Sequence, residues 1–468
     1  MVIVYQVGRL RGEKKTFFVR DASVFKREAE LSSFVLKEYM KAQGKEVEVV
    51  LVYPVSIVLE GKDGKDATRL SCPRDYINEK PFEKERDHLL VVHSLGTYQN
   101  VELKGWYDDI VLELFFDMVK RYLDSTPEAV YFDISSGQNI YIAAMMEAAS
   151  YLAIFTKLLS WAENKSLQIF TIFSDPIIGR ENVGEYEIHI EKRFYDVSFT
   201  SPLISLFKRT ENNTRNFENW LNIILKSIYN GDDEQQKVAK KSLLEKLRQS
   251  LTLYSSIMNS LPLCACYMGR QVVEEIKQEI SRLIEDAEKK LYSNYEFSPR
   301  LNKEIYTSVL CQLAIYIGMI ELLKRNNLHN FNPNDGIDLK SLSEAFRDIL
   351  SKVGQNTMLL MNETDYFART IAGYLKNQKN VRFGEWLNMY EILNSKPEEP
   401  HERNFFAHAG LERNITQVIL NDCLIDRIEN LSLPRLKDFI KNEPKAIRIR
   451  YRDFYGSNKL KAWLMSNL

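Results

Sequence analysis

Residues 128–150 have the sequence EAVYFDISSGQNIYIAAMMEAAS, which predicts a strand, a turn and a helix in direct succession. The apolar residues that end at Phe132 are typical of a buried strand, and the small and polar residues that follow are typical of a turn. The long apolar stretch after the turn predicts a helix. This order of elements is the repeating unit of α/β sheets, in which ligands bind beyond the carboxyl ends of the strands.

The same alternation of strand and helix patterns extends over the first 200 residues. Further strands are expected at residues 2–7, 47–60, 88–98, 167–175 and 186–194. Helices are expected at residues 22–43 and 106–124. Apolar strands separated by helices indicate a Rossmann-like, parallel or mixed sheet that is covered on both faces.

Strand patterns disappear from about residue 203, and helical patterns take their place. We expect helices at about 203–229, 234–258, 270–293, 299–326, 338–354, 358–377, 382–395 and 404–430. The predicted fold class is therefore α/β plus all-α, with an α/β domain at residues 1–200 and a helical region at residues 201–468.

The bulk composition is that of an ordinary globular protein, with 45% hydrophobic and 27% charged residues. Its 63 Lys and Arg residues nearly balance its 64 Asp and Glu residues, so any nucleic-acid binding must come from local patches. Five scattered cysteines indicate reduced thiols. The lone pair of Cys264 and Cys266 has no matching second pair of ligands, so we expect no metal site there.

The expected location is the cytoplasm, without membrane association. No uninterrupted apolar run approaches the roughly 18 residues that a membrane span requires. The closest segment, residues 141–160, contains Glu147 and Lys157 and is expected to be a buried helix. The N-terminal apolar run is short and precedes basic residues, which is the reverse of a signal peptide.

Three turns are expected at the carboxyl edge of the predicted sheet: Gly8–Arg9, Ser94–Thr97 and Ser135–Asn139. Glycines allow a backbone to approach a ligand closely, and free amides at a helix N-terminus favour phosphate. The candidate ligand-binding residues are Gly8, Arg9, Ser94, Gly96, Thr97, Ser135, Ser136, Gly137, Gln138 and Asn139. The stretch SSGQN also fits an ordinary helix N-cap, and the two roles can coexist.

Two further residues near these turns are given structural interpretations. Asp133, at a strand end, is suited to orient the turn that follows it, because its charge disfavours direct contact with phosphate. His93, inside the strand expected at 88–98, is interpreted as a core histidine rather than a catalytic group.

The segment HERNFFAHAG (401–410) places His408 five residues after Arg403. RNA cleavage without a metal needs a proton-transfer group and a fixed cation that stabilises charge growing on the phosphate. Histidine suits the first task because its ordinary pKa is about 6.5, and arginine suits the second because its planar fork matches phosphate oxygens. On a helix Asn404 and His408 share a face, whereas Arg403 lies about 100° around from Asn404.

A structural interpretation of the same segment is also open. In that interpretation His408 packs beside the neighbouring phenylalanines, and Arg403 pairs with Glu402 or Glu412.

The segment RNFFAHAG resembles the R-x4-6-H signature of HEPN ribonucleases, including the polar residue after the arginine and the small residues around the histidine. The first 200 residues resemble the CARF sensor domains of type III CRISPR-associated defence proteins. There FDISSGQN (132–139) is similar to the D-I-S-x-G-x-N ligand loop, and SLGTY (94–98) is similar to a second Gly-Thr loop. The order of the two halves also fits this CARF–HEPN ribonuclease family, and the resemblance covers nearly the whole chain.

The resemblance implies an endoribonuclease that cuts single-stranded RNA without a metal or other cofactor. Its allosteric activator would be a cyclic oligoadenylate, with cyclic tetra-adenylate favoured. The catalytic residues would be Arg403, Asn404 and His408. The family also implies a homodimer or a larger assembly, in which two HEPN domains build one composite site and two CARF domains clasp one ring.

The segment 433–464 is the one basic region, with nine Lys and Arg residues against three acids from residue 435 onward. Arg448, Arg450 and Arg452 alternate with apolar residues, so an extended strand would place three arginines on one face. The aromatic residues that could stack on unpaired RNA bases are Tyr451, Phe454, Tyr455 and Trp463. A solvated charged face explains the same pattern equally well.

The alternative function is that of a nucleotide-responsive regulator whose helical half binds DNA or a partner without cutting. Such a regulator typically carries a basic recognition helix. The strand-like alternation of the basic C-terminal segment argues against it.

Overall fold

The computed structural model describes residues 1–9, 13–20, 24–59, 70–78, 85–98, 100–135, 138–163, 166–175, 184–210, 217–231, 233–452 and 458–468. The chain divides into two compact units. Unit 1 comprises Met1–Ser198 and Lys277–Cys311, and unit 2 comprises Phe199–Ile276 and Gln312–Leu468. Residues 277–311, which the sequence analysis placed in the helical region, thus pack with the α/β unit. Helices α10 (Val273–Leu291) and α11 (Lys303–Arg325) contribute residues to both units.

Unit 1 is built on a mostly parallel sheet, as the sequence predicts. Among the described residues it has eight strands in the order β3-β2-β10-β9-β8-β1-β4-β5. Their bounds are β1 Val2–Val7, β2 Lys15–Arg20, β3 Val24–Ala29, β4 Val47–Pro54, β5 His88–Val92, β8 Ala129–Asp133, β9 Gln168–Ser174 and β10 Glu185–Arg193. Strands β9, β8, β1, β4 and β5 run parallel to one another, and β10 pairs antiparallel with β9.

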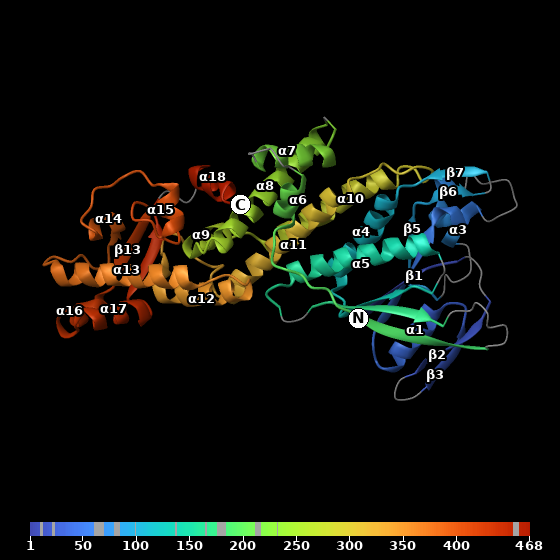
Figure 1. The fold of residues 1–468 in the computed structure, drawn as a ribbon, viewed down its shortest axis with the longest axis horizontal. Helices are drawn as coiled ribbons and strands as arrows, with labels where there is room; N and C mark the ends of the chain where they lie inside the picture. The colour runs from blue at the N-terminus through green and yellow to red at the C-terminus, as the bar shows by residue number, and fades with distance from the viewer. Residues whose placement is uncertain are drawn as a thin grey trace. The chain divides into compact units, whose positions relative to one another are not determined.

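Helices cover both faces of this sheet, which explains why all six residues of β1 are buried. On one face the apolar residues of β1 and β4 share a core with Phe34 and Val35 of α1 (Ser32–Ala42). On the other face Tyr5 donates a hydrogen bond of 2.8 Å to Asp117 of α4 (Tyr107–Ser125). Helix α4 packs in turn on α5 (Asn139–Leu159), and Figure 1 shows these two helices side by side.

Two local predictions for unit 1 were wrong. The helix expected at 22–43 begins only at Ser32, because residues 24–29 form β3 and pair antiparallel with β2. Gly96 and Thr97 do not lie in a turn but in β6 (Leu95–Tyr98), which pairs with β7 (Val101–Lys104) in a separate hairpin. The remaining short elements of this part are η1 (Val55–Leu59) and α3 (Pro73–Asn78).

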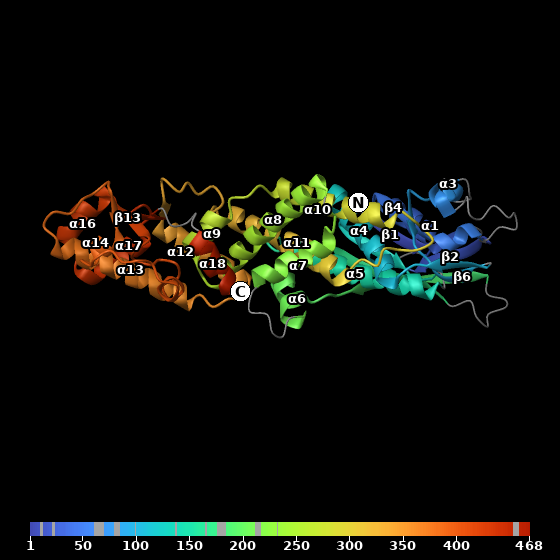
Figure 2. The same ribbon diagram turned by 90° about the horizontal axis from the view of Figure 1, so that it is seen from above.

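Unit 2 is predominantly helical, as predicted. Its helices are α6 Pro202–Thr210, α7 Phe217–Ile228, α8 Glu234–Met258, α9 Pro262–Met268, α12 Leu339–Lys352, α13 Met358–Asn377, α14 Met389–Ile392, α15 Glu402–Ala407, η2 Asp422–Leu424, α16 Ile425–Asn430, α17 Leu433–Asn442 and α18 Asn458–Ser466, together with parts of α10 and α11. Helices α13 and α17 pack against each other, as both ribbon views show (Figures 1 and 2).

Unit 2 also contains a small antiparallel sheet, which the sequence patterns did not predict. Its strands follow the order β11-β14-β13-β12, with bounds β11 Ile337–Asp338, β12 Trp386–Asn388, β13 Thr416–Leu420 and β14 Ile447–Tyr451. Strand β13 lies inside the helix expected at 404–430, and that prediction was wrong between Ala407, where α15 ends, and Ile425, where α16 begins. The helix expected at 382–395 was also wrong outside Met389–Ile392, since it contains β12. Strands β13 and β14 alternate buried and partly exposed residues, and the alternation expected from residue 447 onward is confirmed.

Two described helices, α5 and α11, are long and apolar enough by length and composition to cross a membrane. The apolar window of α11 is 89% buried inside the fold and that of α5 is 50% buried. Both observations fit core helices of a globular fold.

Candidate functional site

The turns after β1 and β8 lie side by side at the carboxyl edge of the sheet. The two strands are parallel neighbours, and Gln6 pairs in register with Asp133. Gly8 follows β1 and donates its amide to Val52 at 2.8 Å. A Cβ atom at Gly8 would lie 2.6 Å from the ring of Tyr53, so the close approach of this turn requires glycine.

Asp133 orients the turn that follows it. Its carboxylate is completely buried and accepts hydrogen bonds from the Ser135 amide, at 2.9 Å, and from the Ser32 hydroxyl. Burial raises the pKa of Asp133, whereas Ser32, Ser135 and the nearby charge of Arg9 lower it. Gln6 extends the network to Ser32 through a hydrogen bond of 3.1 Å. The sequence analysis missed Gln6 and Ser32; a lone polar residue in the apolar stretch VIVYQV was the available signal.

The Ser135–Asn139 turn leads into α5. The Ser135 hydroxyl accepts a hydrogen bond of 2.9 Å from the Ser174 amide on β9, so this side chain ties two strand ends together. Gln138 is the N-cap residue of α5, and its side chain makes no capping hydrogen bond. Asn139 begins the helix and is exposed. Ser136 and Gly137 lie outside the described residues. Gln138 therefore does not cap this long helix, and the positive end of the helix dipole favours an anion there.

The Ser94–Thr97 segment divides between two environments. Ser94 is buried, and its hydroxyl oxygen accepts a hydrogen bond of 2.9 Å from the Ser56 amide. Gly96 and Thr97 are exposed on the β6 strand of the hairpin, and Gly96 has a φ of 111° that favours glycine. Ser94 thus stabilises the strand end, whereas Gly96 and Thr97 are open to solvent.

His93 is a core histidine, as interpreted from the sequence. It lies just after β5 and is completely buried. Its Nδ1 atom lies 2.6 Å from Glu113 Oε1, and its Nε2 atom lies 2.8 Å from the carbonyl oxygen of Asn294. Burial alone would lower the pKa of His93, but Glu113 and Asn294 raise it above its ordinary value. Both ring nitrogens therefore donate hydrogen bonds, and neither is free for catalysis.

In unit 2, helix α15 presents the Arg403–His408 segment to solvent. Phe405 is completely buried and packs against Trp463 and Tyr451, with ring centroids 5.9 and 6.4 Å away. The helix ends at Ala407 and is followed by His408, whose amide donates to the Asn404 carbonyl at 3.0 Å. Phe405 therefore attaches the helix to the core, while Arg403, Asn404 and His408 remain exposed.

The end of α15 depends on left-handed backbone. Ala409 and Gly410 have φ values of 49° and 74°. A Cβ atom at Gly410 would lie 2.8 Å from the Tyr451 hydroxyl, so glycine is required there for two reasons.

His408 is held by a carboxylate on a different helix. Its Nδ1 atom lies 3.0 Å from Glu363 Oε2 on α13, and the two side chains are 47% and 17% exposed. The Tyr366 ring lies 6.5 Å from the His408 ring and is nearly parallel to it. A cavity of about 370 Å³ is lined by Asn362, Glu363, Asp365, Tyr366, Arg369 and His408. A carboxylate only accepts hydrogen bonds, so Nδ1 donates and Nε2 is left available for a substrate proton.

The expected pairing of Arg403 with Glu402 or Glu412 is contradicted. Glu402 accepts hydrogen bonds from Ser466 and Asn467 of the C-terminal segment. Glu412 bonds to Asn414, at 2.6 and 2.8 Å. Among the described residues Arg403 has no hydrogen-bond or ion-pair partner, so its guanidinium is available for a phosphate.

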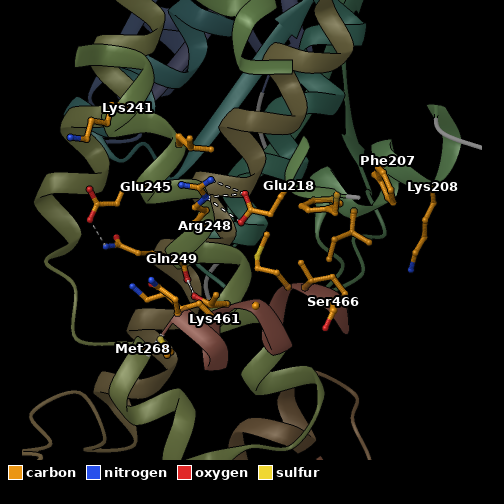
Figure 3. Close-up of a pocket in the computed structure, with 18 residues that line it drawn as sticks. Phe207, Lys208, Glu218, Lys241, Glu245, Arg248, Gln249, Met268, Lys461 and Ser466 are labelled. Atoms are coloured by element: carbon orange, nitrogen blue, oxygen red, sulfur yellow. Dashed lines mark hydrogen bonds and ion pairs between the residues drawn. The ribbon is translucent and has the colours of Figure 1, made fainter. Parts of the chain in front are cut away.

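A larger cavity, of about 850 Å³, lies elsewhere in unit 2, and Figure 3 shows its lining. The Arg248 guanidinium and the Glu218 carboxylate, which line it, form an ion pair of 2.8 Å. Ser466 of α18 also lines it and bonds to Glu402, the residue before Arg403. None of the residues predicted to be functional lines this cavity.

The arginines of the basic C-terminal segment have structural partners. Arg448 donates to the Gly336 carbonyl at 3.0 Å. Arg450 donates to the Asn334 carbonyl at 2.9 Å and lies over the Trp386 ring at 4.2 Å.

The prediction that aromatic residues of this segment stack on bases fails for Tyr451 and Trp463. These side chains are 3% and 8% exposed and belong to the core. Phe454 and Tyr455 lie outside the described residues.

Within the described part of the chain, no group of three or more His, Cys, Asp or Glu residues is placed to hold a metal ion. Cys264 and Cys266 are both buried, and burial raises the pKa of Cys264 to about 12.

Comparison with known proteins identifies both units. Residues 2–176 match the family model "CRISPR system endoribonuclease Csx1, CARF domain", and residues 354–424 match "CRISPR system endoribonuclease Csx1, HEPN domain". The chain belongs to the Csx1 family of CARF–HEPN proteins. It is also similar to the CRISPR system endoribonuclease Csx1 of Methanocaldococcus jannaschii, with 23% identity over 398 residues that cover 79% of this chain and 78% of the relative.

The two matched domains of the Csx1 family contain the candidate residues described above. The CARF match includes the turns at Gly8, Ser94 and Ser135, and the HEPN match includes α15 and the Glu363-bearing part of α13. Sequence reasoning missed Glu363 and Tyr366, because nothing in the local pattern of an amphipathic helix marks a partner 45 residues from His408.

Proposed function

We propose that this Csx1-family ribonuclease is a cyclic-oligoadenylate-activated, metal-independent endoribonuclease that cleaves single-stranded RNA in cytoplasmic type III CRISPR antiviral defence. The observation that carries the proposal is the set of side chains that α15 presents to solvent. It presents an exposed histidine, oriented by a carboxylate, together with an unpaired arginine on the same short helix. These are the two groups that RNA transesterification needs.

In the proposed reaction the substrate 2′-hydroxyl attacks the adjacent phosphorus while the bond to the 5′-oxygen breaks. The products are a 2′,3′-cyclic phosphate and a 5′-hydroxyl. Glu363 holds Nδ1 of His408, at 3.0 Å, so Nε2 faces the substrate and transfers the proton at the reacting oxygens. Arg403 stabilises the negative charge that grows on the phosphorane, and Asn404 positions the phosphate or the histidine.

We propose that the active form is a homodimer, as the family resemblance implies, with one composite site built by two copies. On an ideal helix Arg403 and His408 point about 140° apart, which favours a contribution from a second copy. The apolar residues of α13 near the site support this proposal: Met358 and Met361 are 62% and 43% exposed. Exposed apolar side chains beside a functional site are typical of an interface.

The activator is proposed to bind at the carboxyl edge of the sheet in unit 1. Three features of this edge suit a phosphate-rich ring: the N-terminus of α5, which Gln138 does not cap, the exposed Gly96 and Thr97, and the half-buried Arg9. A ring that binds more tightly to the active arrangement would shift a pre-existing equilibrium toward it.

The test is cleavage of a labelled single-stranded RNA in EDTA, with and without cyclic tetra-adenylate and with the rings of other sizes. We expect cutting that depends on one ring size and survives EDTA. Tight ring binding without any cutting would contradict the enzyme proposal and favour the nucleotide-responsive regulator. Cutting that EDTA abolishes would contradict metal independence.

A further inference from the structure

Three cations converge on one carboxylate beside His408. Asp365 lies on α13, and its Oδ1 atom is 3.1 Å from both Lys437 Nζ and Lys441 Nζ of α17. Its Oδ2 atom is 3.1 Å from the Arg369 guanidinium, one helical turn further along α13. We call these four residues the Asp365 cluster. Lys437 and Lys441 are four residues apart, so they share one face of α17 and point to the same place.

The cluster has more positive than negative charge. In the part of the chain that the structure describes, the other acid paired with these cations is Asp438, 3.6 Å from Lys437 Nζ and 64% exposed. Three cations thus face two acids, while Glu363 is engaged by His408. Lys437 and Lys441 are 23% and 32% exposed, which leaves their ammonium groups accessible to a ligand from solvent.

The Asp365 cluster borders the proposed catalytic histidine. Asp365 and Arg369 line the same cavity of about 370 Å³ as His408 and Glu363. Tyr366 lies between them in sequence, is 48% exposed and has its ring nearly parallel to that of His408. An RNA strand with a phosphate at His408 would therefore pass an exposed aromatic ring and then a cationic cluster.

We propose that Arg369, Lys437 and Lys441 bind an RNA phosphate next to the one that is cleaved, and that Asp365 occupies this phosphate position until RNA arrives. This inference rests on the proposed ribonuclease function and adds the path of the substrate. An internucleotide phosphate has two charged non-bridging oxygens and one negative charge, as a carboxylate has, so it fits the same cationic donors, and its neutralisation releases bound counterions.

A purely stabilising role does not explain the Asp365 cluster. Ion pairs that are this accessible contribute little to stability, so fold stability alone gives no reason to gather three cations around one acid. Lys437 and Lys441 hold the pKa of Asp365 down to about 2, so the carboxylate remains charged throughout any practical assay range. Asp365 therefore competes with RNA at every working pH, and removing its charge should strengthen RNA binding.

The test measures the RNA affinity of two variants, one expected to bind more weakly and the other more tightly than the parent protein. In a His408→Ala background that cannot cut, a labelled mixed-sequence single-stranded RNA is titrated at several salt concentrations. We expect Lys437→Ala/Lys441→Ala to weaken binding about tenfold and to flatten the salt dependence by about 0.7 for each lost phosphate contact. We expect Asp365→Asn to tighten binding about threefold. Lys289→Ala, which removes a surface ion pair with Asp286 in unit 1, is the matched control with unchanged binding.

Unchanged affinity and salt dependence in the double lysine variant would overturn the proposal, and so would weaker binding by folded Asp365→Asn. If Asp365→Asn does not fold, the double lysine variant and its salt slope decide. The two proposals fail separately. Wild type that cuts RNA while the lysine variants bind normally refutes the phosphate position alone. Wild type that never cuts, with the opposite-sign binding effects intact, refutes the ribonuclease function and leaves an RNA-binding site.

Discussion

Among the described residues, the His93–Glu113 and His408–Glu363 pairs both bond through Nδ1 of the histidine but have opposite surroundings. In unit 1 the His93 Nδ1 atom lies 2.6 Å from Glu113, and both side chains are 0% exposed. In unit 2 the His408 Nδ1 atom lies 3.0 Å from Glu363, and the side chains are 47% and 17% exposed. Residue type and pairing therefore do not separate a structural histidine from a catalytic candidate.

The second ring nitrogen makes the difference. In His93 it donates to the Asn294 carbonyl at 2.8 Å, so the ring joins β5 to the segment between α10 and α11. Among the described residues the second nitrogen of His408 has no hydrogen-bond partner, and the ring borders a cavity. The buried pair fixes local structure, whereas the exposed pair leaves one nitrogen for a substrate.

The largest expected effect is on the exposed pair. His408→Ala should lower the rate of RNA cleavage about 10³-fold, because proton transfer by a positioned side chain contributes roughly 10²- to 10⁴-fold. Its thermal unfolding should be nearly unchanged, since the side chain is half exposed. Single-turnover cleavage and a melting curve measure the two quantities. The control is His88→Ala, which loses an exposed ion pair with Glu48 in unit 1 and should cleave RNA normally. If His408→Ala still cleaved RNA, the exposed pair would be no more catalytic than the buried one.

The next effect is on stability and concerns the buried pair. His93→Ala should lower the free energy of unfolding by about 3–5 kcal/mol, because it removes the cationic partner of the buried Glu113 carboxylate and leaves only the residue 93 backbone amide bonded to it. Denaturant unfolding measures this loss. The double variant His93→Ala/Glu113→Ala should lose less than the sum of the two single variants, since it contains no lone buried charge. Additive losses would show that the two side chains do not act as a pair.

A smaller effect sharpens the comparison within the exposed pair. Glu363→Gln should lower kcat roughly tenfold to hundredfold and leave KM nearly unchanged, because an amide no longer fixes the tautomer of His408. Glu363→Asp should recover part of the rate. The readout is the pH–rate profile: a shifted profile identifies a positioning residue, whereas a uniform loss of folded protein at all pH values would indicate a packing defect.

The smallest effect is the pH dependence of the buried pair. His93 has a raised pKa in the folded protein, so the proton on its ring stabilises the fold fully below the unfolded pKa of about 6.5. That contribution is lost as pH rises through the folded pKa, at roughly 1.4 kcal/mol for each unit of difference. We expect the melting temperature of wild type to fall over this range more than that of His93→Gln. Parallel curves would mean that His93 is neutral in the folded state.

The sequence predicted the centre of unit 1 well and its edge poorly. Strands β1 and β8 are fully buried, so their apolar runs are visible without knowledge of the fold. Strand β3 carries Lys26, Arg27 and Glu28, and only its pairing with β2 makes it a strand. The local sequence does not indicate that partner strand, and the pattern of the segment alone predicts a helix.

The candidate site in unit 2 shows the same limit. The Arg403–His408 segment was recognised from its own residues, and in the structure it is helical up to Ala407, with Arg403, Asn404 and His408 exposed. Its supporting partners could not be found in this way, because Glu363 and Trp463 lie 45 and more residues away along the chain. Strand β13 was missed because its sequence, TQVIL, ends in three consecutive apolar residues, which do not alternate and fit a helix equally well.

The most direct test of the account is the chemistry of the RNA ends produced in EDTA by the activated wild-type protein, with His408→Ala as the blank. The account predicts 2′,3′-cyclic phosphates and 5′-hydroxyls, no cutting where the attacking ribose is replaced by 2′-deoxyribose, and no products from the variant. Cleavage at a 2′-deoxy position, products with a 3′-hydroxyl, or the same products from His408→Ala would contradict it.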